Sequence, residues 1–180
     1  QKRFVNSHGI LAKNLARKVQ SNALIVPEQA RRALSTVVVP VDFSAHSAKA
    51  LQMAVALQQS TDQNLRIIAV NVYEMPNVSA YMLSKTEAEF RRMVEEDRTA
   101  AFDAFLATHA GSAQSEIEQK LIEKDRPGVG HYLMDYALEE NADLIIMGAK
   151  GHSKLELLLL GSVTEDLLAR NKNIPTLVVK

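Results

Sequence analysis

Short β-branched runs alternate with helix-length segments from residue 36 to the end of the chain, and this alternation constrains the fold more than any other feature. The runs expected to be strands are Thr36–Asp42, Leu65–Tyr73, Gln114–Glu123, Asp143–Gly148 and Thr176–Val179. Strands joined by crossovers of this length run parallel and are covered by helices. The sequence therefore predicts an α/β fold with a Rossmann-like open five-stranded parallel sheet and helices on both faces.

The segments between these strands carry helix signals, and polar residues mark where the helices begin. The expected helices cover residues 44–59, 85–109, 129–137 and the stretch after 162. Ser44 is expected to cap the first of them. Ser84 with Glu87, and Ser162 with Glu165, have the spacing of a capping box and are expected to open two others.

Composition restricts the kind of protein that this chain can be. Its 180 residues include no cysteine, which excludes a disulfide scaffold, and the five histidines show no spacing typical of metal ligands. No apolar run approaches the roughly 18 residues of a membrane span, and the N-terminus lacks the apolar region of a secretory signal. Lysine plus arginine equal aspartate plus glutamate at 21 each, which argues against a chain that coats nucleic acid. We therefore expect a cytoplasmic protein with no metal ligands of its own and no membrane or nucleic-acid partner.

The balance of charge conceals an uneven distribution. Residues 1–35 hold seven cationic side chains against one acidic side chain, whereas the remainder of the chain is acidic overall. A basic arm that contacts nucleic acid is one interpretation of this segment. A helix with a solvated basic face is the other, and we prefer it because it requires no partner.

The beginning of the chain resembles its end. Residues 8–27 align with residues 161–180, so that Leu15-Ala16-Arg17 falls on Leu168-Ala169-Arg170 and Leu24-Ile25-Val26 falls on Leu177-Val178-Val179. Both stretches read as a helix, a short link and a strand. This similarity predicts an internal repeat, although two amphipathic segments can also resemble each other by chance.

On the repeat interpretation, residues 1–27 are the tail of an upstream copy of the domain, 28–35 are a linker, and 36–180 are the domain itself. The strand Thr176–Val179 would otherwise leave an exposed sheet edge. We expect it to pair antiparallel with Ala23–Val26, within one chain or across two.

A glycine pattern follows the fourth expected strand. It reads G-x2-G-x9-G-S and consists of Gly148, Gly151, Gly161 and Ser162. Glycine lets the backbone approach an anion closely, and a helix start offers unpaired N–H groups to phosphate. Thr164 adds a hydroxyl at that helix start, and Lys150 adds a positive charge or lies in solvent. The pattern indicates a phosphate site, although each glycine also fits a loop and Ser162 fits an ordinary N-cap.

This pattern, preceded by Asp-Leu-Ile-Ile-Met, resembles the ATP-binding signature of the universal stress protein family. The run Val38–Ser44 is similar to that family's opening V-P-x-D-x-S, and the resemblance extends from Thr36 to Lys180. It implies that Asp42 holds the ribose or adenine side and that the Val72 backbone reads the adenine edge. The implied cofactor-binding residues are Pro40, Val41, Asp42, Val72, Met147, Gly148, Lys150, Gly151, Gly161, Ser162, Val163 and Thr164.

The resemblance also implies a function. It predicts a stress-response regulatory module that binds ATP, or ADP or AMP in its place, with Mg²⁺ held through the phosphates. It further implies pairing, as a homodimer or a tandem pseudo-dimer, through Thr176–Val179. The upstream tail has His8-Gly9 where Gly161-Ser162 stand, so the site of that copy is expected to be degenerate.

No catalytic residue is assigned, because the motifs hold anions but supply no acidic pair for two metals. We therefore expect slow or no hydrolysis. One alternative is a slow ATP hydrolase or nucleotide phosphotransferase with Asp42 or Asp166 as the base. A second alternative is a structural pairing domain that binds no nucleotide.

Overall fold

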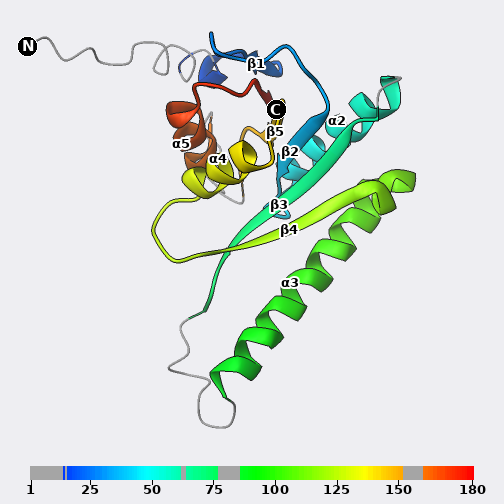
Figure 1. Cartoon of the computed structure of the whole chain (residues 1–180), viewed down its shortest axis with the longest axis vertical. Coiled ribbons are helices and arrows are strands. Elements are labelled where there is room, and N and C mark those ends of the chain that lie inside the picture. Colours follow the sequence, from blue (N-terminus) through cyan, green and yellow to red (C-terminus); the bar gives the residue numbers. More distant parts are fainter. Residues whose placement is uncertain (1–13, 15, 62–63, 77–85, 152–159) are drawn as a thin grey trace, which may run out of the picture.

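Strands and helices alternate along one sheet in the computed structural model, which describes residues 14, 16–61, 64–76, 86–151 and 160–180 (Figure 1). The strands are β1 (Ala23–Ile25), β2 (Thr36–Pro40), β3 (Arg66–Glu74), β4 (Ile117–Lys124), β5 (Leu144–Gly148) and β6 (Thr176–Val179). The α-helices are α2 (Ala45–Ser60), α3 (Glu87–His109), α4 (Gly130–Glu139) and α5 (Ser162–Arg170), and residues 16–18 are also helical.

The sheet has the order β1-β6-β5-β2-β3-β4, and all neighbours are parallel except β1 and β6. The predicted α/β fold is confirmed, but the predicted count of five strands is wrong by one. The sixth strand is β1, which pairs antiparallel with β6 within this chain. It lies where the internal repeat placed a strand, and its pairing covers the edge that β6 would otherwise expose.

Helices cover both faces of the sheet, and each face has its own core. Alternate residues of a strand point to opposite faces, so Ile67 packs with α2 and α3 whereas the adjacent Ile68 packs with α4 and α5. Phe102 and Leu106 of α3 are fully buried in the first core. The two cores hold the carboxyl ends of the parallel strands at one common edge.

Helix α3 begins later than the sequence predicted. Its capping box consists of Thr86 and Glu89 rather than Ser84 and Glu87, and Ser84 lies outside the described residues. Figure 1 shows its N-terminal half extending away from the rest of the molecule.

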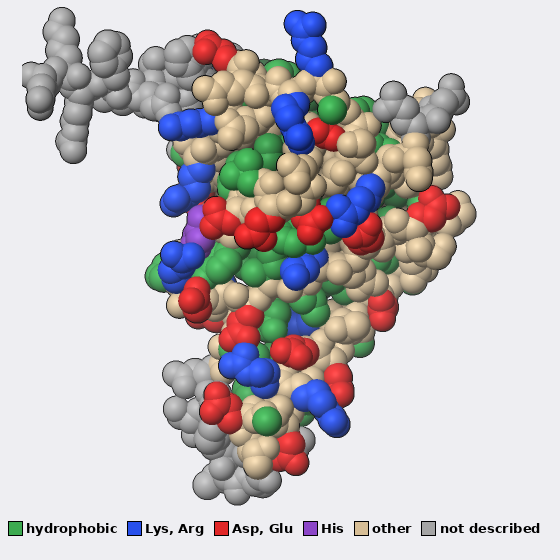
Figure 2. All heavy atoms as spheres, in the orientation of Figure 1, with side chains coloured by type: hydrophobic (Ala, Val, Ile, Leu, Met, Phe, Trp, Pro, Cys, Tyr) green, Lys and Arg blue, Asp and Glu red, His purple; other side chains and the backbone are tan. Residues whose placement is uncertain are grey.

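On the face in Figure 2, acidic and basic side chains are interspersed. Among the described helices, none is both long and apolar enough to cross a membrane.

Strand β4 also starts later than expected. Residues 114–116, predicted as strand, belong to a 3₁₀-helix, Gly111–Glu116, that follows α3. Gly111 has a φ of 59°, which glycine adopts at no steric cost, so the chain turns tightly there before β4 begins.

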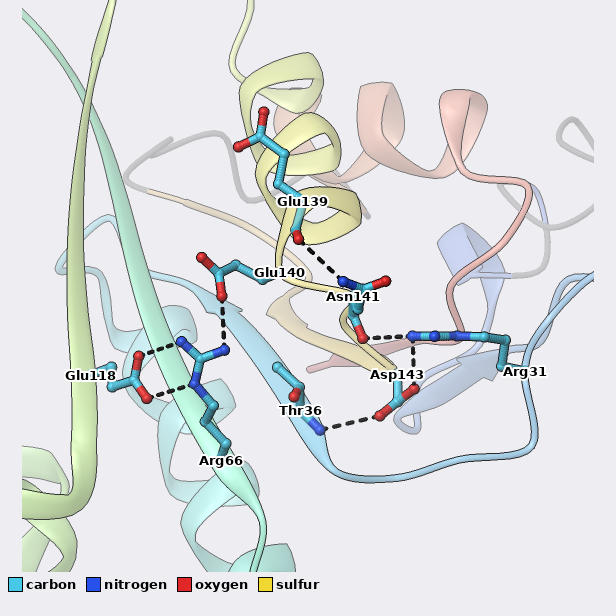
Figure 3. A network of polar contacts seen from close by, with 8 residues as sticks. All are labelled: Arg31, Thr36, Arg66, Glu118, Glu139, Glu140, Asn141 and Asp143. Atoms are coloured by element: carbon cyan, nitrogen blue, oxygen red, sulfur yellow. Dashed lines mark hydrogen bonds and ion pairs between the residues drawn. The ribbon is translucent and has the colours of Figure 1, made fainter.

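Polar networks fix the amino-terminal edge of the sheet (Figure 3). The Arg66 guanidinium binds the carboxylates of Glu118 and Glu140, which joins β3 to β4 and to the end of α4. Nearby, the buried carboxylate of Asp143 accepts hydrogen bonds from the backbone N–H of Thr36 and from Arg31. These contacts lie at the opposite end of the sheet from the glycine pattern.

Candidate functional site

A cavity of about 380 Å³ lies at the carboxyl ends of β2, β3 and β5. This is where the strand order reverses, between β2 and β5, and ligands of open α/β sheets bind at such a point. All twelve residues that the sequence assigned to a cofactor line this one cavity. Its volume lies in the range of roughly 300–1,000 Å³ typical of small-molecule sites.

Four further residues line the cavity that the sequence analysis did not assign to it. They are Ser47, Val70, Val129 and Leu133. Val129 and Leu133 belong to an apolar stripe at the start of the helix expected over residues 129–137, and the sequence analysis predicted no functional role for them. The first turn of a helix that follows a parallel strand lies at the carboxyl edge of the sheet. This rule could have placed Val129 and Leu133 near the site from the sequence alone. The cavity therefore has an apolar wall from β3 and α4 in addition to the residues of the glycine pattern.

A strained turn directs Asp42 toward that loop. Asp42 Oδ1 accepts a hydrogen bond of 3.1 Å from the Ser44 N–H, and Phe43 between them has a positive φ of 64°. Phe43 packs edge-on against Phe102 at 5.7 Å, which stabilises this unusual backbone conformation. A Cβ atom on Gly151 would lie 2.4 Å from Asp42 Oδ2. A side chain at 151 would therefore displace the carboxylate from this position.

Packing alone is sufficient to require glycine at position 148. A Cβ atom at this position would lie 2.8 Å from the backbone carbon and the Cβ of His46. The first turn of α2 thus packs directly on the last residue of β5. This contact brings Ser47 and Asp42 to the same edge as the glycine loop.

The N-terminus of α5 is tied to the end of β5. The Gly161 N–H donates to the Ala149 carbonyl at 2.7 Å, and the Thr164 hydroxyl donates to the Gly148 carbonyl at 3.0 Å. The predicted capping box of Ser162 and Glu165 is wrong, because Gly161 is the N-cap and no side chain caps the helix. Ser162 is instead the first helical residue, and it is exposed at the cavity. An uncapped helix start next to a cavity suits an anion.

Three lysines, Lys49, Lys150 and Lys180, lie near one another, and Lys150 lines the cavity. Burial, followed by the charges of Lys49 and Lys150, lowers the pKa of His46, and Asp42 opposes this shift. Burial and the charge of Lys150 also lower the pKa of Lys180, whose carbonyl accepts a hydrogen bond from Lys49 Nζ at 3.2 Å. Within the described parts of the chain, no three His, Asp or Glu side chains are placed to hold a metal ion.

The fold and the cavity define an open α/β sheet protein with a cavity at the switch in strand order. A sequence model described as the universal stress protein family matches residues 34–180. The chain belongs to this family.

Universal stress proteins that are already known resemble this chain in sequence and in structure. The universal stress protein MJ0577 of Methanocaldococcus jannaschii is 28% identical over 153 residues, which cover 80% of this chain and 93% of that protein. The solved structure of MJ0577 has a TM-score of 0.60 at 22% identity, covering 81% of this chain and 95% of that chain. A universal stress protein solved in complex with cAMP has a TM-score of 0.50 at 28% identity, covering 82% and 97%.

One similar structure is considerably longer than this chain. A universal stress protein from Archaeoglobus fulgidus DSM 4304 has a TM-score of 0.58 at 20% identity. The similarity covers 94% of the present chain but 53% of that one. The structural similarity therefore extends beyond residues 34–180, which the family model matches.

Proposed function

We propose that this chain is an ATP-binding regulatory module of the stress response that hydrolyses ATP slowly or not at all. The observation that carries the proposal is the convergence of twelve residues, chosen from the sequence, on one cavity. A protein of the same family that is 28% identical was solved with cAMP, which is also an adenine nucleotide.

The two sides of the cavity suit the two parts of such a ligand. Val70 and Val72 of β3, with Leu133 of α4, offer an apolar surface for the adenine ring. The uncapped start of α5 and Lys150 lie across from it and offer N–H groups and positive charge for phosphates. Mg²⁺ would be held through the phosphates.

Two observations favour binding over hydrolysis. Asp42 is the only carboxylate among the described residues that line the cavity, and its Oδ1 already accepts the Ser44 N–H. Asp166, the other candidate base, does not line the cavity and pairs with Arg170 at 2.8 Å. Of the two candidate bases, Asp42 is therefore the one that the cavity supports. Turnover of Mg-ATP faster than about one per second would support that alternative.

The proposal is tested by denaturing the purified protein and identifying any released small molecule by chromatography. We expect about one adenine nucleotide per chain, with ATP predominant, because the cavity offers a surface for the adenine ring and another for the phosphates. The chain has no tryptophan, so a bound adenine dominates its ultraviolet spectrum. Absence of nucleotide, together with no thermal shift on adding Mg-ATP, would contradict the proposal.

A second test uses a substitution at Ser162 that should weaken ATP binding without lowering the stability of the protein. An aspartate in place of Ser162 would interact favourably with the α5 dipole, so the melting temperature of Ser162→Asp should be unchanged or slightly higher. The same charge would repel phosphates, and we expect ATP affinity to fall about tenfold or more. Ser162→Ala is the matched control, with a small effect on both quantities. Equal ATP affinity in all three proteins, measured by calorimetry, would place the phosphates elsewhere.

We further propose that residues 1–27 end an upstream copy of the domain. The repeat aligns Leu24 with Leu177, and these two residues pair directly across β1 and β6. Ala23 pairs with Val178 and Ile25 with Thr176, so the register is symmetric about that central pair. Two equivalent strands related by a twofold axis pair in this way. The similarity to 94% of this chain within a longer structure also supports the proposal.

Exposure of β1 agrees with a missing neighbour. Leu24 and Val26 are 58% and 61% exposed, whereas the equivalent Leu177 and Val179 pack into the core beneath α2. An upstream copy would cover β1 in the same manner. An antibody against this chain should therefore detect, in the source cells, a protein roughly twice the size of 180 residues. A band at the size of this chain alone would contradict the tandem organisation and favour a homodimer.

A further inference from the structure

We infer that the N-terminal segment, defined here as residues 16–26, positions the anion loop and thereby sets the affinity for phosphate-bearing ligands. The name anion loop is used here for two short stretches only, Lys150–Gly151 and Leu160–Gly161, and Lys150, Gly151 and Gly161 line the cavity. The inference rests on the proposed nucleotide site, and it assigns a part of the affinity to residues that do not line the cavity.

The contact between the segment and the loop is apolar, and it is fully buried at Ala16 and partly buried at Ile25. Ala16 and Ile25 pack in one cluster with Ala149, Leu160, Leu168 and Val178. Ala149 directly precedes the anion loop, and Leu160 is the residue before Gly161. Their exposed fractions are 1% and 2%, and that of Ala16 is zero. The segment therefore packs behind both ends of the loop at once.

Polar contacts hold the segment in this place. Lys180 donates from Nζ to the Ala16 carbonyl at 2.8 Å and from its backbone N–H to Asn22 Oδ1 at 3.0 Å. Arg17 forms an ion pair with Glu165, which lies in the first turn of α5. The segment thus contacts the helix whose N-terminus faces the cavity as well as the loop that precedes it.

The two ends of the loop are also joined to each other and to the sheet. The Gly161 N–H donates to the Ala149 carbonyl, and the Ala149 N–H donates to the Val179 carbonyl, each at 2.7 Å. A shift of Ala149 or Leu160 would therefore move the start of α5 relative to the cavity. Anion binding depends on the direction of those N–H groups, whereas the apolar wall of β3 and α4 lies away from the segment.

The test compares a ligand with phosphates and a ligand without them. Ile25→Asp places a charge in the buried cluster, and we expect the ratio of ATP affinity to adenosine affinity to fall about fivefold or more. Leu24→Asp is the matched control, because Leu24 is the adjacent residue and is 58% exposed. Its ratio should equal that of the wild type. Arg17→Ala, which keeps the apolar cluster, is the second variant if Ile25→Asp does not fold, and its ratio should fall as well.

The outcomes separate this inference from the proposed function. A wild-type chain that binds neither ATP nor adenosine contradicts the proposed function, and the inference with it. A wild type that binds both, with an unchanged ratio in Ile25→Asp and Arg17→Ala, contradicts the inference alone. Equal losses of ATP and adenosine affinity would also overturn it, because the segment would then support the fold without positioning the loop.

Discussion

Replacing Gly148 with alanine should lower the melting temperature by roughly 2–12 °C and reduce the amount of nucleotide that the protein retains. The added Cβ would lie 2.8 Å from the backbone carbon of His46, so relief of the clash requires α2 to move as a body. Overpacking of this kind has a free-energy cost of about 1–3 kcal/mol. Because α2 also carries Ser47, the displacement should widen the cavity at its polar side.

Gly161→Ala serves as the control for this prediction. A Cβ there would lie 3.3 Å from the Cα of Lys150, a distance that a small local adjustment can accommodate. Its melting temperature should therefore fall much less than that of Gly148→Ala, as measured by calorimetry or circular dichroism. Equal melting temperatures for Gly148→Ala and the wild type would show that the approach of α2 to β5 is not a constraint.

Removing the carboxylate of Asp143 should destabilise the fold at neutral pH by about 2–4 kcal/mol. The side chain is 4% exposed, and its Oδ2 accepts hydrogen bonds from the Ser35 N–H, the Ser35 hydroxyl and the Thr36 N–H. Arg31 donates to Oδ1 at 3.1 Å. Asp143→Ala would leave these donors without an acceptor at the start of β2. Chemical denaturation measures the loss directly.

The pH dependence of this effect has a definite sign. Burial raises the pKa of the Asp143 carboxyl, but hydrogen bonds from Ser35 and Thr36 and the charge of Arg31 outweigh it, so the pKa lies below its usual value. A lowered pKa stabilises the fold above the ordinary carboxyl pKa, and this stabilisation disappears as the pH falls through the folded-state value. The difference between wild type and Asp143→Ala should therefore shrink in strong acid. Asp135→Ala, on the exposed side of α4, should change stability by less than about 0.5 kcal/mol.

The gathering of the site residues could be predicted because parallel topology fixes it. Once Asp42 and Gly148 are placed after parallel strands, their side of the sheet is determined, and the cavity forms where the strand order reverses. The residues contributed by α4 were missed because Val129 and Leu133 serve two roles. Their apolar stripe faces the core along most of the helix and faces the cavity only in its first turn.

Helix starts were predicted less well, for a local reason. The sequence offers two overlapping capping-box patterns before α3, and periodicity does not distinguish Ser84 from Thr86. At α5 the outcome depends on a contact distant along the chain. The Gly161 N–H donates a hydrogen bond to the Ala149 carbonyl, and Gly161 is therefore the N-cap of α5. Ser162 is the first helical residue, and its side chain does not cap the helix. Such tertiary hydrogen bonds cannot be inferred from residue spacing.

Strand β1 also has a consequence for the behaviour of the chain in solution. It covers β6 but presents a new outer edge, with Leu24 and, just beyond the strand, Val26 largely exposed. Exposed apolar edges promote intermolecular β-pairing and aggregation. Here the edge is only three residues long, and Pro27 lies two residues beyond its end, where it offers no N–H for further pairing. The brevity of β1 and the proline that follows it therefore act as safeguards of colloidal stability, and lengthening this strand should make concentrated solutions prone to precipitate.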